Sequence, residues 1–425
     1  MRKFFLGLIC FISLQLVHAQ RTIIYCGQLI DVKNLQVQKE MSIIISGNSI
    51  SEVQKGYAKA EATDKTIDLK SKTVMPGLMD MHVHVEEETS PNRYIDGFTK
   101  NKSDRAYVAI GLAQKDFMAG FTTLRDLGGS GVNISLRNAI NKGLVIGPRI
   151  YTAGKSLATT GGHADPTNNY REDLMGDPGP DEGVVNGLAD CAKAVRMRYK
   201  TGADLIKITA TGGVLSMAKD GSGAQFTEEE IRMIVSTAKD YGFKVAAHAH
   251  GAEGMKRAVL AGVNSIEHGT YMTDEVMELM KQHGTYLVPT IIAGKSSADS
   301  AKIPGYYPEI VRAKALVVGN YIQATFARAY KAGVKIAFGT DAGVYAHGKN
   351  WMEFVYMTEG GMPILECIKA ATVNAADLLG VTDILGTIEK GKYADIIAVD
   401  GDPTKDVMVM EKVSFVMKNG VVYKN

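Results

Sequence analysis

The sequence contains little that would support a disulfide scaffold, a nucleic-acid surface or a flexible linker. Three of its four cysteines, Cys26, Cys191 and Cys367, lie beyond the N-terminal leader, and they are odd in number and widely spaced. Such cysteines form no disulfide framework, and a chain of 425 residues can bury a core that needs none. The formal net charge is only +2, without long basic runs, which argues against nucleic acid as a partner. No low-complexity segment marks a linker or a further domain.

An apolar stretch long enough to span a membrane is also missing. Residues 1–19 begin with Arg2 and Lys3, continue with apolar residues 4–17 and end in Val17-His18-Ala19, which resembles a cleavage site with small residues. This is the pattern of a secretory signal peptide, and it is too short for a transmembrane helix. We therefore expect an exported protein, periplasmic or secreted, with no membrane span.

The middle of the chain repeats one arrangement, in which a helical stretch ends at a glycine and a short apolar strand follows. Glycine ends helices in the left-handed conformation, so each repeat is the αβ half of a βα unit. The glycines are Gly120, Gly202, Gly242, Gly262, Gly284 and Gly333. The strands expected after them are 121–127, 203–209, 243–249, 263–268, 285–292 and 334–340, and a strand ending at His84 and another over 149–153 complete eight. Eight parallel strands alternating with helices predict an α/β fold, a (β/α)8 TIM-like barrel with its chemistry at the carboxyl ends of the strands.

Two histidines, His82 and His84, close the first of these strands. Because side chains alternate along a strand, both point to the same face and can hold one cation together. Imidazole and carboxylate ligands favour Zn, Mn, Co or Fe over Ca or Mg. A lone His-X-His fits polar strand-end residues equally well, so the metal interpretation depends on companions at other strand ends.

Lys207 lies in an apolar strand, between Ile206 and Ile208. Burying its ammonium costs several kcal/mol or forces it to lose its proton. A neutral amine can take up carbon dioxide, and the resulting anionic carbamate could bridge two cations. A lysine that extends its charged end to water is the alternative for the residue taken alone. Its place at the end of the fourth strand favours the metal interpretation.

Further candidate ligands follow the fifth, sixth and eighth strands. His248 and His250 share a face, and we assign the ligand to His248, leaving His250 as an outer contact or a loop residue. His268 is the sole histidine at the end of its strand. Asp341 can hold a metal with one oxygen and take a proton from water with the other, as a general base. An N-cap for the next helix is the alternative for Asp341.

This set of strand-end residues resembles the ligand pattern of the amidohydrolase superfamily. The segments Gly-Gly-His163-Ala-Asp165 and Gly-Thr-Asp341-Ala-Gly-Val-Tyr-Ala-His-Gly348 resemble its imidazolonepropionase-related branch. That branch contains Xaa-Pro dipeptidases, other metal-dependent dipeptidases and ochratoxin-type amidases. Imidazolonepropionase itself uses one metal and no lysine on strand four, so Lys207 favours the two-metal peptidases.

The resemblance implies two divalent ions, with zinc favoured, and a bridging carboxylated lysine. A hydroxide between the ions is the implied nucleophile, and its proton passes to the leaving amine through the aspartate. The implied ligands are His82, His84 and Asp341 for one ion and His248 and His268 for the other, with Lys207 bridging both.

Two more histidines are implied to contact the substrate. His163, in the loop after strand three, would face the substrate carbonyl or its oxyanion as a hydrogen-bond donor. His347, six residues beyond Asp341, would help to bind a substrate carboxylate. For each, the alternative is a loop histidine without a role in binding.

The two ends of the chain predict a second, smaller unit. Residues 21–53 and 386–425 are typical of short alternating strands, with turns at Gly27 and Gly47. The resemblance implies that they pair into one small β-sandwich, and that residues 367–380 form the last barrel helix. The expected division is 1–19 for the signal peptide, 20–75 with 385–425 for the sandwich, and 76–384 for the barrel.

The sequence thus favours an exported, metal-dependent amidohydrolase that acts on dipeptides of the Xaa-Pro type or on N-acyl amino acids. A hydrolase of cyclic amides or a deaminase is the alternative within enzymes. A non-catalytic protein that binds metal or peptide on a degenerate barrel is the alternative outside them, although the complete ligand set argues against it. Barrel hydrolases of this branch often form homo-oligomers, and no charge or coiled-coil pattern indicates how this chain would assemble.

Overall fold

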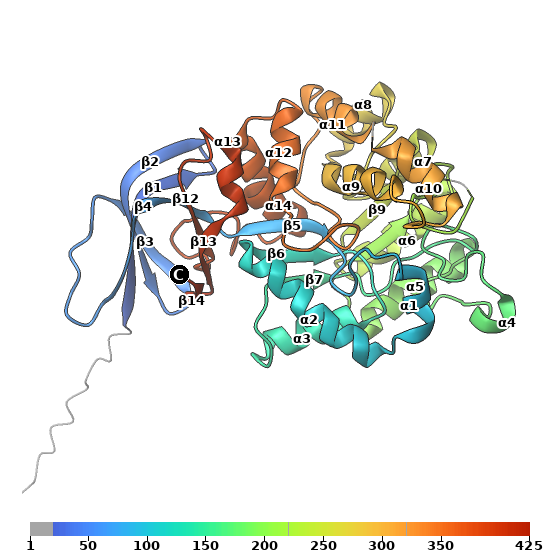
Figure 1. The fold of residues 1–425 in the computed structure, drawn as a ribbon, viewed down its shortest axis with the longest axis horizontal. Helices are drawn as coiled ribbons and strands as arrows, with labels where there is room; N and C mark the ends of the chain where they lie inside the picture. Colours follow the sequence, from blue (N-terminus) through green and yellow to red (C-terminus); the bar gives the residue numbers. More distant parts are fainter. Residues whose placement is uncertain (1–19, 220, 320) are drawn as a thin grey trace, which may run out of the picture.

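The computed structural model describes residues 20–219, 221–319 and 321–425. The predicted signal peptide therefore lies outside the described residues. Figure 1 shows two parts beside one another, a larger one of strands surrounded by helices and a smaller one in which the blue and red ends of the chain meet. In the described residues, no helix combines the length and apolar character needed to cross a membrane.

Seven strands of the larger part form two parallel sheets. One sheet contains β5 (Leu78–Val83), β6 (Phe121–Asp126) and β7 (Arg149–Thr152), in that order. The other contains β8 (Ile206–Thr209), β9 (Val245–Ala249), β10 (Ser265–His268) and β11 (Tyr286–Val288).

Backbone hydrogen bonds at both borders join the two sheets into a closed barrel. At one border, Leu157 pairs with Ile208 beyond β7. At the other, residues 336–342 run between the sheets, with Ile336 paired to Leu287 and Ala342 to Val83. This segment is the eighth strand position, and it is irregular but bonded on both sides. The predicted (β/α)8 barrel is therefore confirmed, although its eighth member is not a regular strand.

The seventh strand is shorter than the sequence predicts. The expected range is 285–292, but β11 ends at Val288 and helix α9 (Ile291–Ala301) begins three residues later. Thr290, with a φ of 50°, turns the chain in the left-handed conformation between them. The prediction is wrong beyond residue 288 because the apolar Ile291 and Ile292 are buried by a helix rather than by a strand.

Helices cover the outside of the barrel (Figure 1). The helices between and after the strands are α2 (Lys102–Met118), α3 (Val132–Asn141), α5 (Gly187–Thr201), α6 (Glu228–Asp240), α7 (Ala252–Ala261), α8 (Asp274–His283), α11 (Ile322–Lys331), α12 (Met352–Glu359), α13 (Ile364–Lys369), the π-helical η1 (Ala370–Asn374) and α14 (Ala375–Leu379). All six glycines expected at helix ends have positive φ values, and those after α5, α7 and α8 are left-handed C-caps. One apolar core joins all of these helices except α14 to the strands, and α14 packs in a separate cluster with Met79 and Met81 of β5.

Three further helices lie in the connections that follow strands. They are α1 (Arg93–Thr99), α4 (Glu172–Met175) and α10 (Glu309–Val318). Val311, Ala315 and Val318 of α10 pack with Val214 and Tyr307 in a separate apolar cluster. Loops and short helices of this kind form the walls of the site described below.

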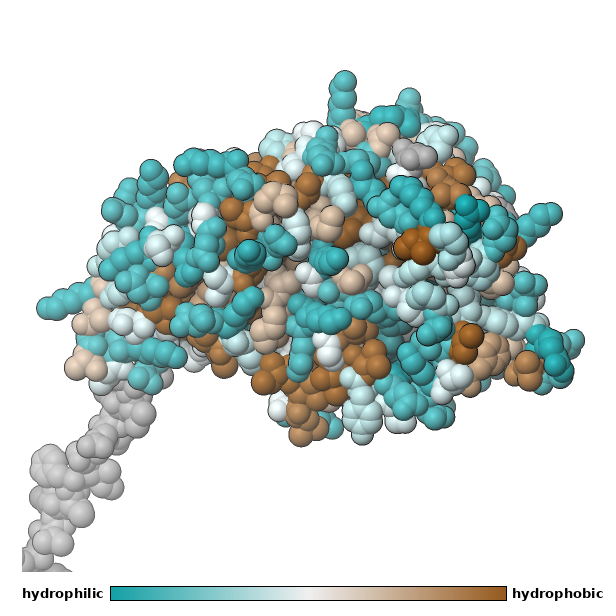
Figure 2. All heavy atoms as spheres, viewed as in Figure 1, coloured by the Kyte–Doolittle hydropathy of each residue, from teal (hydrophilic) through white to brown (hydrophobic). Residues whose placement is uncertain are grey.

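Both ends of the chain build the smaller part, as predicted. Its seven strands are ordered β14-β13-β12-β4-β1-β2-β3, so that strands from the C-terminus extend a sheet begun at the N-terminus. Their bounds are β1 (Arg21–Asp31), β2 (Gln36–Ser46), β3 (Ser49–Lys55), β4 (Lys65–Pro76), β12 (Ile396–Asp400), β13 (Val413–Lys418) and β14 (Val421–Lys424), with the 3-10 turn η2 (Val407–Glu411) after β12. Buried side chains such as Leu69 and Phe415 form their shared core. Figure 2 shows hydrophilic residues over most of the face in view, with apolar residues in smaller groups.

Gly27 does not form the turn expected from the sequence. It lies inside β1, where the pairing with β4 shifts register between Cys26 and Gln28. A Cβ atom on Gly27 would lie 1.9 Å from the carbonyl oxygen of Lys70. The glycine therefore permits close approach of two backbones, whereas Gly47, with a φ of 60°, does occupy a turn.

We predict that Gly27→Ala lowers the free energy of unfolding by about 1–3 kcal/mol, because the β1 and β4 backbones must move apart. The measurement is the thermal midpoint, with Gly111→Ala as the control. Gly111 lies in α2, and a Cβ atom added to it would meet nothing within 4 Å, so alanine there should stabilise the helix slightly. Equal midpoints for the two variants would contradict the assigned role of Gly27.

Candidate active site

A cavity of about 230 Å³ lies among the strand ends of the barrel. The six residues predicted as metal ligands line it together, although they come from strands distributed along the whole barrel sequence. These are His82, His84, Lys207, His248, His268 and Asp341, and His163 and His250 join them. This volume is below the roughly 300–1,000 Å³ typical of sites for drug-sized ligands, but four of the lining residues, Glu87, Arg93, His163 and Ala164, also line a neighbouring cavity of about 680 Å³.

His82 and His84 both direct a ring nitrogen toward Asp341. The Nδ1 of His82 donates to Glu267 Oε2 at 3.0 Å, and its Nε2 lies 3.4 Å from Asp341 Oδ1. The Nδ1 of His84 donates to the Gly128 carbonyl at 2.8 Å, and its Nε2 lies 3.3 Å from the same oxygen. Three ligand atoms, from β5, from the residue that follows it and from the eighth strand position, thus converge.

These three residues fit a divalent cation. Oδ1 of Asp341 is buried and has no hydrogen-bond partner among the described residues, in spite of its two imidazole neighbours. Ligand atoms about 2.0–2.1 Å from a tetrahedral zinc ion are about 3.4 Å apart, which matches the separations from His82 and His84. A buried carboxylate oxygen left unpaired between two imidazoles is satisfied by a shared ion.

The protonation preferences of the two histidines differ. Burial and the nearby Lys207 lower the pKa of His82 to about 4, so its Nε2 carries a free lone pair. Burial also acts to lower the pKa of His84, but Asp341 and Asp126 outweigh it and raise the pKa to about 9. The proton that Asp341 attracts to His84 occupies the place that a cation would take.

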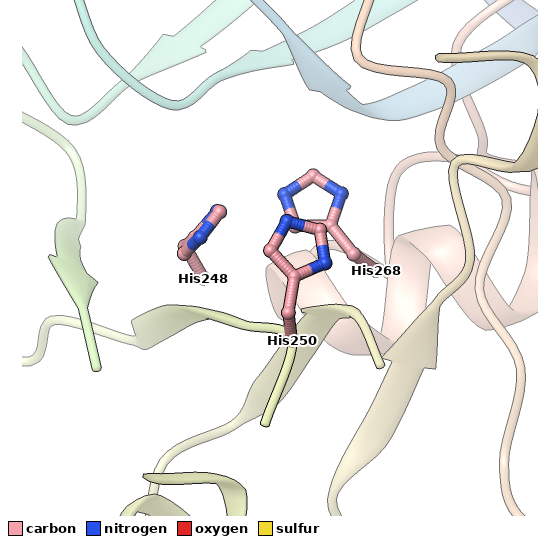
Figure 3. Close-up of side chains that lie close together, drawn as sticks. All are labelled: His248, His250 and His268. Atoms are coloured by element: carbon pink, nitrogen blue, oxygen red, sulfur yellow. The ribbon is translucent and has the colours of Figure 1, made fainter. Parts of the chain in front are cut away.

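A second group of potential ligands consists of His248, His250 and His268. Their ligand atoms lie within 4.8 Å of one another, and Figure 3 shows the three rings gathered around one space. Each ring has one nitrogen held by a protein oxygen: His248 by the Gly212 carbonyl at 3.1 Å, His250 by Thr270 Oγ1 at 2.8 Å and His268 by Thr290 Oγ1 at 2.6 Å. Burial lowers the pKa of all three histidines, which leaves the other nitrogen free to bind an ion.

In a third combination, His82, His268 and Asp341, the ligand atoms also lie within 4.8 Å of one another. His268 therefore belongs to both sides of the site, and two adjacent cation positions fit the arrangement. The sequence predicts His250 to be an outer contact or a loop residue, yet its ring lies within the cluster. The shared face of His248 and His250 on their strand was the sequence signal that could have included it.

Lys207 is buried beside His82, with 3.5 Å between its Nζ and His82 Nε2. Burial lowers the pKa of its amine to about 8, even though Glu267 and Asp341 act in the opposite direction. A larger fraction of this lysine is therefore uncharged near neutral pH than of a lysine in water. That is the form of the amine that reacts with carbon dioxide.

His163 lies over the second group of potential ligands, where it can donate a hydrogen bond into the cavity. Its ring stacks on that of His248 with 4.3 Å between centroids, and its backbone N–H donates to Gln225 Oε1 at 2.8 Å. Burial, together with the neighbouring His250 ring and the Lys314 ammonium, lowers the pKa of His163 to about 3, so the ring is neutral. A Cβ on Gly213 would come within 2.2 Å of this ring, which explains the glycine there.

The structure does not bring His347 into the cavity. Its Nδ1 donates to Asp116 Oδ2 at 2.7 Å and its Nε2 donates to the Glu87 carbonyl at 3.1 Å. Both nitrogens are therefore protonated, in agreement with the raised pKa that Asp116 gives this histidine against the effect of burial. With both nitrogens engaged, His347 has no donor left for the substrate carboxylate that the sequence assigned to it.

A buried ion pair supports His82 from the barrel interior, and sequence reasoning missed it. Arg125 Nη2 donates to Glu267 Oε1 at 2.8 Å, and the other oxygen of Glu267 accepts from His82. Burial alone would raise the pKa of Glu267, but Arg125 and His82 lower it to about 2. His268, the next residue, has a φ of 73°, which breaks the strand alternation and lets two consecutive side chains reach the site. That break had no sequence signal.

Comparison with known proteins gives consistent results over nearly the whole chain. The model of the amidohydrolase family matches residues 73–423. Ochratoxinase from Aspergillus niger is 32% identical over a 432-residue alignment that covers 96% of this chain and 87% of the relative. A solved structure described as a Xaa-Pro dipeptidase with bound methionine in the active site is 54% identical, with a TM-score of 0.94 and coverage of 96% of this chain and 100% of its own. A prolidase complexed with N-methylphosphonate-L-proline is 31% identical, with a TM-score of 0.87 and the same coverage.

We predict that Glu267→Gln weakens zinc affinity about 10- to 100-fold, because His82 loses the carboxylate that fixes its orientation. The measurement is a zinc titration of the metal-free protein against a chromophoric chelator. Glu228→Gln is the control, since Glu228 pairs with Arg232 on the surface of α6. Unchanged zinc affinity in Glu267→Gln would contradict the orienting role.

Proposed function

Because this chain belongs to the amidohydrolase family, whose model matches residues 73–423, we propose that it is a two-metal hydrolase of amide bonds in dipeptides. The Xaa-Pro type is favoured, and N-acyl amino acids are a second class of substrate. The observation that carries the proposal is the convergence of an unpaired Asp341 oxygen, neutral histidines and a buried lysine in one small cavity.

The named relatives support this choice of substrate. The 54% identical neighbour is described as a Xaa-Pro dipeptidase with bound methionine, and a 31% identical one as a prolidase with a proline phosphonate. Ochratoxinase is the name of the 32% identical relative. The first two names point to peptide substrates for this chain, since a free amino acid and a proline derivative are the molecules bound there.

Bound divalent ions would lower the pKa of a water molecule and polarise the scissile carbonyl. The residues of this chain would hold and assist them in distinct ways. Asp341, kept ionised by His82 and His84 against the effect of burial, takes the proton of the attacking water and delivers it to the leaving amine. His163, neutral and buried over the cavity, donates an N–H to the carbonyl oxygen as negative charge develops on it. Lys207, if carboxylated, would add anionic oxygen ligands for these ions beside His82.

We predict that the zinc-loaded protein releases free amino acid from Xaa-Pro dipeptides faster than from other dipeptides and N-acyl amino acids. The released amino acid is quantified for each member of such a panel. Asp341→Asn is nearly the same size and should lose about 100-fold or more of turnover, whereas a non-catalytic binding protein would keep its affinity for peptide. No release from any member, in protein that carries two metal ions, would reject the peptidase and favour cyclic amides or amines as substrates.

We predict that Lys207→Ala abolishes most activity and that a short-chain carboxylic acid restores part of it, because the acid supplies the missing bridging oxygens. Lys200→Ala, which removes an exposed lysine of α5, is the control. It should leave the rate of hydrolysis unchanged, both with and without the carboxylic acid. Metal content is measured for each variant by elemental analysis. Full activity with two bound metals in Lys207→Ala would contradict a carboxylated lysine bridge.

A further inference from the structure

We propose that Arg93 binds the free α-carboxylate of the substrate, so that this enzyme requires a C-terminal carboxylate and prefers an apolar C-terminal residue. The inference rests on the proposed function, because it concerns the same cavity and the same class of substrate. It gives the role that the sequence assigned to His347 to a different residue, which had no signal in the sequence.

Arg93 is the first residue of α1, in the connection that follows β5, and it lines the cavity with His163 and Asp341. A guanidinium has five N–H donors. Among the described residues, the side chain of Arg93 makes one hydrogen bond, from Nη2 to Glu87 Oε1 at 2.8 Å. The remaining donors are available in a cavity wall, and the fork of a guanidinium matches the two oxygens of a carboxylate.

The position of Arg93 is fixed by Glu87, which lines the same cavity. Glu87 holds the guanidinium, and the backbone carbonyl of Glu87 accepts a hydrogen bond from His347 Nε2 at 3.1 Å. Oε2 of the neighbouring Glu88 accepts from the backbone N–H of His347 at 2.9 Å. A cation held in this way loses little side-chain freedom when it binds an anion.

The charge distribution of the cavity leaves Arg93 as the anion-binding group. Among the described lining residues, Arg93 and Lys207 are the arginine and lysine side chains. Lys207 lies against His82 and takes part in the proposed metal site. Because Asp341 repels a substrate carboxylate and Lys207 is engaged at the proposed metal site, Arg93 is the cation of the cavity wall that can pair with that carboxylate.

The other residues of the cavity wall indicate which side chain the C-terminal residue of the substrate carries. Val214, Leu215, Val318 and Ile322 line the cavity together with Gly294. A Cβ on Gly294 would come within 2.8 Å of the Ile322 side chain, so the space beside it is limited. An apolar side chain of moderate size buries its surface there, whereas a charged one would lose its hydration.

The test compares a carboxylate with the matching carboxamide. Binding of leucine and of leucinamide to the zinc-loaded protein is measured by calorimetry, and leucyl-proline and its C-terminal amide are compared as substrates. We expect Arg93→Met to weaken leucine binding about 10- to 100-fold, the loss typical of one charge-assisted pair, and to leave leucinamide binding unchanged. Arg93→Lys, which keeps the charge and can keep the contact with Glu87, should recover part of the loss.

Arg232→Met removes an exposed arginine that also pairs with a glutamate and is the matched control. Equal losses for leucine and leucinamide in Arg93→Met, or no preference for leucine in the unchanged protein, would overturn the proposal. A preference for leucine over leucinamide that depends on Arg93, without hydrolysis of any dipeptide, would support carboxylate binding by Arg93 and reject the proposed peptidase activity. Equal hydrolysis of the dipeptide and its amide would reject carboxylate binding by Arg93 and support the peptidase activity.

Discussion

A chain of buried polar groups runs through the middle of the barrel, from Arg125 through Glu267 to the neutral ring of His82. All three side chains are excluded from water, so the charges of Arg125 and Glu267 are tolerable only because each is the partner of the other, and removal of one partner of such a pair typically costs about 3–5 kcal/mol. The chain joins β6, β10 and β5, and its last member is a candidate metal ligand. The same contacts that hold three strands together therefore also fix the orientation of the His82 ring.

Barrel closure positions the other candidate metal ligands. The eighth strand position is bonded on both sides without forming a regular strand, and the backbone N–H of Asp341 donates to the His82 carbonyl at 2.7 Å. Asp341 and His268 both have positive φ, with values of 60° and 73°, as does Thr290, which holds the His268 ring. Left-handed residues other than glycine are strained and concentrate where a side chain must be directed for function. The irregular backbone thus accompanies the convergence of ligands from distant strands on one point.

Loops above the strands add the features that distinguish substrates. Arg93 and Glu87 come from the connection after β5, His163 from that after β7, and Val214 and Leu215 from that after β8. The last of these loops is held by Lys314 of α10, whose ammonium donates to the carbonyls of Gly213, Ser216 and Ala218. The candidate metal-binding half of the cavity is therefore built on strands, and the other half on loops that helices hold in place. This division lets specificity vary while the chemistry stays the same.

Local rules were sufficient to predict the barrel and the six candidate ligands. Glycine at helix ends and the alternation of side chains placed the strands, and the strand ends grouped His82, His84, Lys207, His248, His268 and Asp341. Other features arose only when the chain folded. Folding turned His347 onto Asp116, 231 residues away, placed Gly27 against Lys70 and paired Glu267 with Arg125. Each of these outcomes is a contact between residues far apart in the chain, and local propensity carries no information about which distant side chain will arrive. The conformational preference of a residue follows from its neighbours in sequence, but the partner of a buried charge is fixed only when the barrel closes.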